Sequence, residues 1–170
     1  MVSVDQIAEW CKPWNHLFSH SKVIAGSVTG AHILALMFGG GFAIGADRLT
    51  LRVDPSDASA VAAQLRDVRD VHAPVIWALV VLIGTGIALA LSDVETFLPS
   101  VYFWIKLTLV TALLVNGAIL RATERRLAAS SARDVPVTST TWSRMRVLAW
   151  SSVLLWTATA VAGIVLSNIS

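Results

Sequence analysis

Charged side chains are scarce in this sequence. Only 14% of its 170 residues are Asp, Glu, Lys or Arg, whereas 55% are hydrophobic, and the mean hydropathy is +0.69. A soluble globular domain carries about 25% charged residues, so this composition argues against a water-soluble protein. The pI is about 9.1, but the net charge is only +2, which gives little support to a nucleic-acid partner.

Cysteine is nearly absent, since Cys11 is the only one. A single cysteine excludes an intramolecular disulfide framework and a cysteine-based zinc site. The opening stretch MVSVDQIAEW has acidic but no basic side chains, so we do not expect a secretory signal there. Phosphate-binding glycine loops, HExxH and GxSxG are also missing. A membrane subunit for electron transfer or for structure is therefore expected, rather than a stand-alone enzyme.

Long apolar runs, by contrast, are abundant. About 20 helical residues cover a ~30 Å hydrocarbon layer. Such a run must be helical because lipid offers no hydrogen bonds to its backbone N–H and C=O groups, which a helix pairs internally. The sequence predicts an all-α integral membrane four-helix bundle that forms one domain over residues 1–170. The expected spans are about 22–46, 72–92, 100–121 and 145–167.

The arginines predict the orientation of these spans. All ten lie in the connections after the first and third spans: Arg48, Arg52, Arg66, Arg69, Arg121, Arg125, Arg126, Arg133, Arg144 and Arg146. By the positive-inside rule these connections are cytoplasmic. We therefore expect a multi-pass protein of the bacterial inner membrane, with both termini on the extracytoplasmic side.

The segments outside the spans also carry helical patterns. Residues 4–20 mix tryptophans with polar residues, which predicts a short helix in the outer membrane interface. Residues 47–71 predict a cytoplasmic helical extension, formed by a hairpin that turns near 53–56 and is capped by Asp54 or Ser56. In the second connection, Pro136 marks a turn, and Thr140 or Thr141 is the expected cap of the fourth helix.

Two histidines offer the clearest chemistry. His32 lies deep inside the first span, and ionisable residues in that environment usually mark a function. With a hairpin turn near residues 54–55, residue i of one helix lies level with about residue 109−i of the other. His72 is then level with residue 37, five residues from His32, which corresponds to ~7.5 Å along the helix axis. Two facing histidines can fill both axial positions of a haem iron, and Arg66 and Arg69 can hold its propionates. Alternatively, His32 bonds a hydroxyl or carbonyl of a neighbouring span and His72 is an interfacial residue.

A second metal site is conceivable in the N-terminal segment. His16 and His20 are spaced i, i+4, and Cys11 precedes them; imidazole and thiol together suit copper. Pro13 stands between the thiol and the histidines, so solvated histidines on an interfacial segment are the other possibility.

Three further features have structural interpretations. The triplet Gly39–Gly41 predicts close helix approach, and Asn116 predicts an interhelical hydrogen bond. Lys106 lies five residues into the third span and is expected to extend to the outer interface, or to contact an anionic head group or cofactor carboxylate.

The runs AHILALMFGGGFAIGADRLTLR, VHAPVIWALVVLIGTGIAL and FWIKLTLVTALLVNGAIL resemble small bacterial inner-membrane proteins of uncharacterised function. Those proteins are distantly similar to copper-resistance D-type membrane domains and to di-histidine b-type cytochromes. The resemblance implies haem b on His32 and His72. Because spans three and four contain no histidine, one haem is the most that it implies.

Together these observations predict a membrane b-type cytochrome, or the membrane subunit of a redox complex, that binds one haem by bis-histidine ligation and transfers electrons. The alternative is a cofactor-free structural or copper-handling membrane protein. Besides the lipid bilayer, the expected partners are a redox partner, a larger membrane complex or a second copy of the chain.

Overall fold

The computed structural model describes residues 4–131 and 139–168, and every regular element in them is an α-helix. The helices are α1 (Val4–His20), α2 (Lys22–Arg52), α3 (Ala58–Ser92), α4 (Val94–Phe97), α5 (Val101–Ser131) and α6 (Ser139–Ser167). For these residues the predicted all-α class is confirmed.

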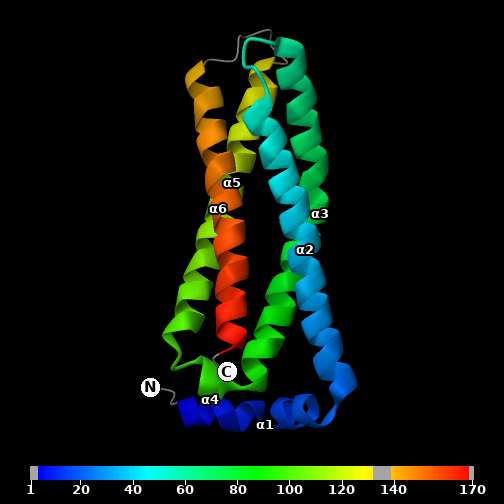
Figure 1. The fold of residues 1–170 in the computed structure, drawn as a ribbon, viewed down its shortest axis with the longest axis vertical. Coiled ribbons are helices and arrows are strands. Elements are labelled where there is room, and N and C mark those ends of the chain that lie inside the picture. The colour runs from blue at the N-terminus through cyan, green and yellow to red at the C-terminus, as the bar shows by residue number, and fades with distance from the viewer. Residues whose placement is uncertain (1–3, 132–138, 169–170) are drawn as a thin grey trace.

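The four long helices lie alongside one another, and α1 and α4 lie across one end (Figure 1). We call that end the terminal end, and the opposite end, where α2 turns into α3, the arginine end. Helix α2 packs against both α3 and α6, and α5 packs against α6, whereas α3 and α5 touch much less.

All four long helices are long and apolar enough to cross a membrane. Their outward faces carry large apolar side chains that no other helix covers; Val23 is 77% exposed, Trp77 71% and Met37 65%. Such faces are unfavourable in water and are satisfied by lipid. The chain therefore has the features of a multi-pass membrane protein.

Glycines set the distance between three of these helices. A Cβ on Gly39 would lie 2.9 Å from Cβ of Ala78 on α3 and 3.3 Å from the indole of Trp156 on α6. A Cβ on Gly40 would lie 3.2 Å from the same indole, whereas one on Gly41 would meet nothing within 4 Å. The predicted role of this triplet in close helix approach is confirmed for its first two members.

The turn between α2 and α3 lies where the sequence predicts it, but the cap differs. Asp57 is the N-cap of α3, and its Oδ1 accepts hydrogen bonds from the backbone N–H groups of Ser59 and Ala60 at 2.9 and 3.0 Å. Asp54 instead closes the turn by accepting from the N–H and hydroxyl of Ser56. The predicted cap at Asp54 or Ser56 is wrong because residues 54–57 form a hydrogen-bonded turn, from the N–H of Asp57 to the carbonyl of Asp54, and α3 begins only at Ala58.

The cap predicts a pH-dependent stability. The hydroxyl and backbone N–H of Ser59, together with the N–H of Ala60, hold the pKa of Asp57 below its ordinary value. The stabilisation is therefore present at neutral pH and lost as the pH falls through that depressed pKa. We expect Asp57→Ala to lower the melting temperature at pH 7. The difference from wild type should begin to shrink below about pH 4 and vanish once the pH is below the depressed pKa of Asp57. Asp67→Ala, on the exposed face of α3, is the control. A difference that persists unchanged in acid contradicts this role.

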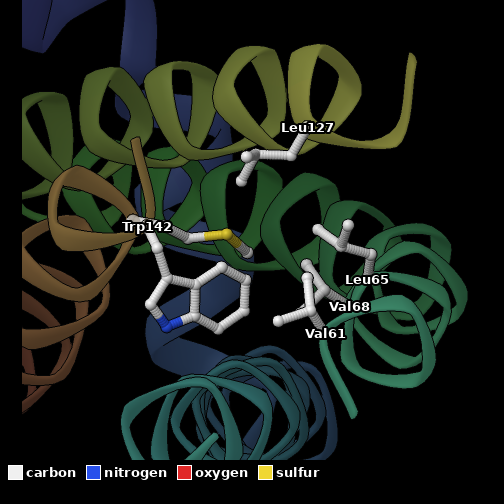
Figure 2. Packing of buried hydrophobic residues seen from close by; sticks show 6 residues of the cluster. Val61, Leu65, Val68, Leu127 and Trp142 are labelled. Atoms are coloured by element: carbon white, nitrogen blue, oxygen red, sulfur yellow. The ribbon is translucent and has the colours of Figure 1, made fainter. Parts of the chain in front are cut away.

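The buried hydrophobic core lies at the arginine end. Figure 2 shows Val61, Leu65 and Val68 of α3 facing Leu127 of α5 and Trp142 of α6, and Met145 completes the cluster. Trp142 is 1% exposed and Met145 is fully buried. The helices thus continue past their apolar stretches as an extension with a core of the kind found in soluble proteins.

Polar side chains add cross-links between helices. Gln64 of α3 donates to the carbonyl of Ala46 and the hydroxyl of Thr50 on α2, at 3.1 and 2.9 Å. Asn116 of α5 donates to the carbonyl of Leu148 on α6 at 3.1 Å, as its predicted role requires. Helix α6 begins at Ser139, so its expected caps are wrong: Thr140 and Thr141 lie inside its first turn. The predicted turn at Pro136 lies outside the described residues.

Helix α1 closes the terminal end (Figure 1). The indole N–H of Trp14 donates to the carbonyl of Ala88 at 2.8 Å, and the amide of Asn15 donates to the carbonyl of Ser92 at 2.6 Å. The predicted helix over residues 4–20 therefore exists and is docked on α3.

Candidate functional site

His32 is held by a hydroxyl on the neighbouring helix. Its Nδ1 lies 2.9 Å from Oγ1 of Thr85, and that hydroxyl lies 2.6 Å from the carbonyl of Val81, to which it donates. Because the single hydroxyl proton goes to Val81, Nδ1–H of His32 donates to Thr85. The Thr85 hydroxyl thus links the His32 ring to the backbone of α3. His32 thus makes the bond to a hydroxyl of a neighbouring span that was the alternative to haem ligation, and its partner is Thr85 on α3.

His72 lies elsewhere along the same helix. Its Nδ1 donates to the carbonyl of Val68, one turn earlier on α3, at 2.6 Å. Thr85, which marks the level of His32, is thirteen residues further along α3, which corresponds to about 20 Å at 1.5 Å per residue. The structure therefore does not bring His32 and His72 together.

The predicted level of the two histidines fails because the hairpin arms are staggered. Gly39 faces Ala78 and His32 faces Gly86, so residue i lies opposite about 117−i instead of 109−i. Residues 53–57, which connect α2 to α3, carry the chain beyond the end of α2 before α3 starts, and α3 projects further at the arginine end (Figure 1). His72 is therefore level with residue 45 instead of residue 37.

A haem held by both histidines does not fit this arrangement. Axial imidazole nitrogens on one iron lie on the order of 4 Å apart, far less than the separation along α3. Gly86 also lies against the His32 ring: a Cβ added to Gly86 would be 3.4 Å from Cε1 of His32. The two histidines therefore cannot serve together as the axial ligands of one haem iron.

This conclusion gives a spectroscopic prediction. Protein purified from cells supplied with haem is expected to show no Soret band from a bis-histidine haem. No Soret band should therefore be abolished by both His32→Ala and His72→Ala. A bis-histidine spectrum abolished by each of these substitutions would contradict the placement of the two helices. His16→Ala, on the exposed face of α1, is the control for loss of an unrelated imidazole.

The alternative copper ligands do not form a cluster either. The rings of His16 and His20 stack with centroids 4.0 Å apart, and Nδ1 of His20 bonds the carbonyl of His16 at 2.9 Å. Cys11 is half-buried with a free thiol. Among the residues that the structure describes, no three His, Cys, Asp or Glu side chains come close enough to hold a metal ion. Copper binding by Cys11, His16 and His20 stays a prediction.

A basic cavity lies at the arginine end between α3 and α5. Its volume is about 360 Å³. It is lined by Arg69 and His72 of α3 and by Arg121, Glu124, Arg125 and Ala128 of α5. Two predicted haem-site residues, His72 and Arg69, thus meet around one cavity. The third, Arg66, is exposed and does not line it.

The cavity carries an excess of positive charge. Three guanidinium groups line it and Glu124 is its only carboxylate. Within residues 4–131 and 139–168, no carboxylate forms an ion pair with Arg69, Arg121 or Arg125. One carboxylate cannot balance three guanidinium groups, and an anion between them reduces their mutual repulsion. The cavity is therefore suited to a phosphate or another multiply charged oxyanion.

The position of the cavity matches a membrane boundary. Arg121 follows 20 residues of α5, which span about 30 Å and thus the hydrocarbon thickness. On α3, the exposed Trp77 follows His72 by five residues and lies on the side of the apolar stretch. Tryptophan is favoured just inside such a boundary. The cavity therefore lies where the apolar stretches of α3 and α5 end.

Sequence patterns did not identify the α5 half of this site. Arg121, Glu124 and Arg125 are spaced i, i+3 and i+4, which places them on one face of a helix. That spacing was a detectable signal, but which helix the face meets depends on tertiary packing.

Comparisons with protein-family models, with curated proteins and with solved structures each find no match. The resemblance to copper-resistance D-type domains and b-type cytochromes therefore stays a prediction.

Proposed function

We propose that this protein is a multi-pass membrane protein that binds an anionic phospholipid by its phosphate head group in the basic cavity between α3 and α5. The observation that carries the proposal is the convergence of Arg69, Arg121 and Arg125, without ion pairs to described carboxylates, around a cavity of about 360 Å³.

Arginine suits this role chemically. A guanidinium group presents a planar fork of N–H donors that matches phosphate oxygens, and it stays charged at any physiological pH. His72 lines the same cavity, where the hydrogen bond from its Nδ1 to the carbonyl of Val68 fixes the ring on α3. Basic pockets between membrane helices bind anionic lipid head groups by this chemistry.

The orientation follows from the same charges. We propose that the arginine end is cytoplasmic, because short loops rich in Lys and Arg stay on that side of a bacterial inner membrane. Both termini and α1 are then extracytoplasmic. The bound lipid belongs to the inner leaflet, where its acyl chains lie along the weakly contacting α3 and α5.

The proposal is tested by lipid titration of the detergent-purified protein. Phosphatidylglycerol is expected to raise the melting temperature saturably, and phosphatidylcholine at equal concentration is expected to have no comparable effect. Inorganic phosphate forms a third arm: a rise as large with phosphate as with lipid identifies a soluble phosphate compound as the ligand. No rise with either phosphatidylglycerol or phosphate contradicts the proposal.

A further inference from the structure

A second polar cluster lies between the helices in the terminal half of the molecule, far from the basic cavity. His32 on α2 bonds Thr85 on α3, as described above. From α5, Nζ of Lys106 lies 3.5 Å, and Cε 3.8 Å, from the point where a Cβ on Gly163 of α6 would be. Lys106 and His32 also interact electrostatically. All four long helices therefore contribute to one level of the interior.

The Lys106 amine has no counter-charge among the described residues. Its side chain is half-buried against α6. The extension of Lys106 to the outer interface stays a prediction. It makes no hydrogen bond or ion pair within the described ranges 4–131 and 139–168. An ammonium group inside a membrane is costly unless it is paired. The cluster, with His32 beside it, therefore has an unmet demand for negative charge.

Thr159 of α6 adds an unused hydroxyl. It is 2% exposed, and its Oγ1 has no hydrogen-bond partner among the residues that the structure describes. Other helical threonines, such as Thr108, Thr111 and Thr157, donate to the carbonyl four residues earlier at 2.9 Å. Thr159 lies one turn before Gly163 and therefore on the same face of α6. A donor is thus available on the helix face that Lys106 contacts.

We infer that Lys106 and Thr159 bind one small monovalent anion of the halide class, with His32 beside it. The ammonium supplies charge and up to three N–H donors, and the threonine supplies an O–H donor. A monovalent anion is inferred because Lys106 supplies one positive charge. A small one is inferred because the His32 ring and the Lys106 ammonium already lie in van der Waals range of α3 and α6, at 3.4 and 3.5 Å from the Cβ positions of Gly86 and Gly163. The inference does not depend on lipid binding at the arginine end.

The test is the anion dependence of thermal stability in detergent. Sodium chloride and sodium bromide are compared with sodium gluconate at equal sodium concentration. We expect chloride and bromide to raise the melting temperature of the wild type saturably, relative to gluconate. In Lys106→Met that rise is expected to disappear, and in Thr159→Val half-saturation is expected to need about tenfold more chloride, as for the loss of one hydrogen bond.

Lys22→Met is the matched control, because it removes the same charge at the exposed start of α2 and should keep the full chloride effect. The readout is the difference between chloride and gluconate within each variant, so a change in basal stability does not obscure it. A wild type that is insensitive to chloride, or a chloride effect that survives Lys106→Met, overturns the inference.

Discussion

Gly39→Ala is expected to destabilise the protein by about 1–3 kcal/mol, the usual cost of overpacking a close interface. The added Cβ would lie 2.9 Å from Cβ of Ala78 and 3.3 Å from the indole of Trp156. Neither neighbour can move freely, because one is fixed to the α3 backbone and the other is 4% exposed between helices. The helices must therefore separate, and other contacts between α2, α3 and α6 weaken with them.

Gly41→Ala provides the matched control two residues away. Nothing lies within 4 Å of a Cβ at that position, so alanine should be neutral or stabilising by up to about 1 kcal/mol through its helix propensity. Thermal unfolding in detergent measures both variants. The double variant Gly39→Ala with Ala78→Gly should recover part of the loss, since it removes the closest contact. Equal effects of Gly39→Ala and Gly41→Ala would contradict the packing of α2 against α3 and α6.

Removing two arginines from the basic cavity should weaken the binding of anionic lipid strongly. Each arginine near an anionic head group contributes about 1 kcal/mol, so Arg69→Gln with Arg125→Gln should raise the Kd for phosphatidylglycerol by roughly tenfold to thirtyfold. Affinity for phosphatidylcholine, which is already weak, should change little. The salt dependence of binding should also decrease, because fewer charges take part.

The control for this variant is Arg48→Gln with Arg66→Gln. It removes the same net charge from exposed positions on α2 and α3 at the same end, but neither side chain lines the cavity. It should keep at least most of the affinity for phosphatidylglycerol. If both double variants lose affinity equally, the lipid responds to the general charge of the arginine end and not to the cavity.

The membrane helices were predictable because hydropathy is a local property. The four apolar runs are bounded by charged or turn-forming residues, and each run lies inside one of α2, α3, α5 and α6. The helical extension and the turn between α2 and α3 were also predictable, since Pro55 and its polar neighbours interrupt the pattern.

The register of α2 against α3 was not predictable from the sequence. It depends on how far residues 53–57 advance the chain, and a displacement of a few residues moves His72 by more than a helical turn. The bis-histidine hypothesis depended entirely on that register. The cavity likewise joins residues of α3 to residues about 50 positions away on α5, and no local pattern specifies that pairing.

Native mass spectrometry of the detergent-purified protein tests the central claim most directly. With phosphatidylglycerol and phosphatidylcholine supplied in equal amounts, the wild type should retain phosphatidylglycerol selectively, at one molecule per chain. Arg69→Gln with Arg125→Gln should lose that molecule, whereas Arg48→Gln with Arg66→Gln should keep it. A wild type that retains no phosphatidylglycerol, or a cavity variant that retains it as well as the control does, contradicts the assignment of the basic cavity as a lipid site.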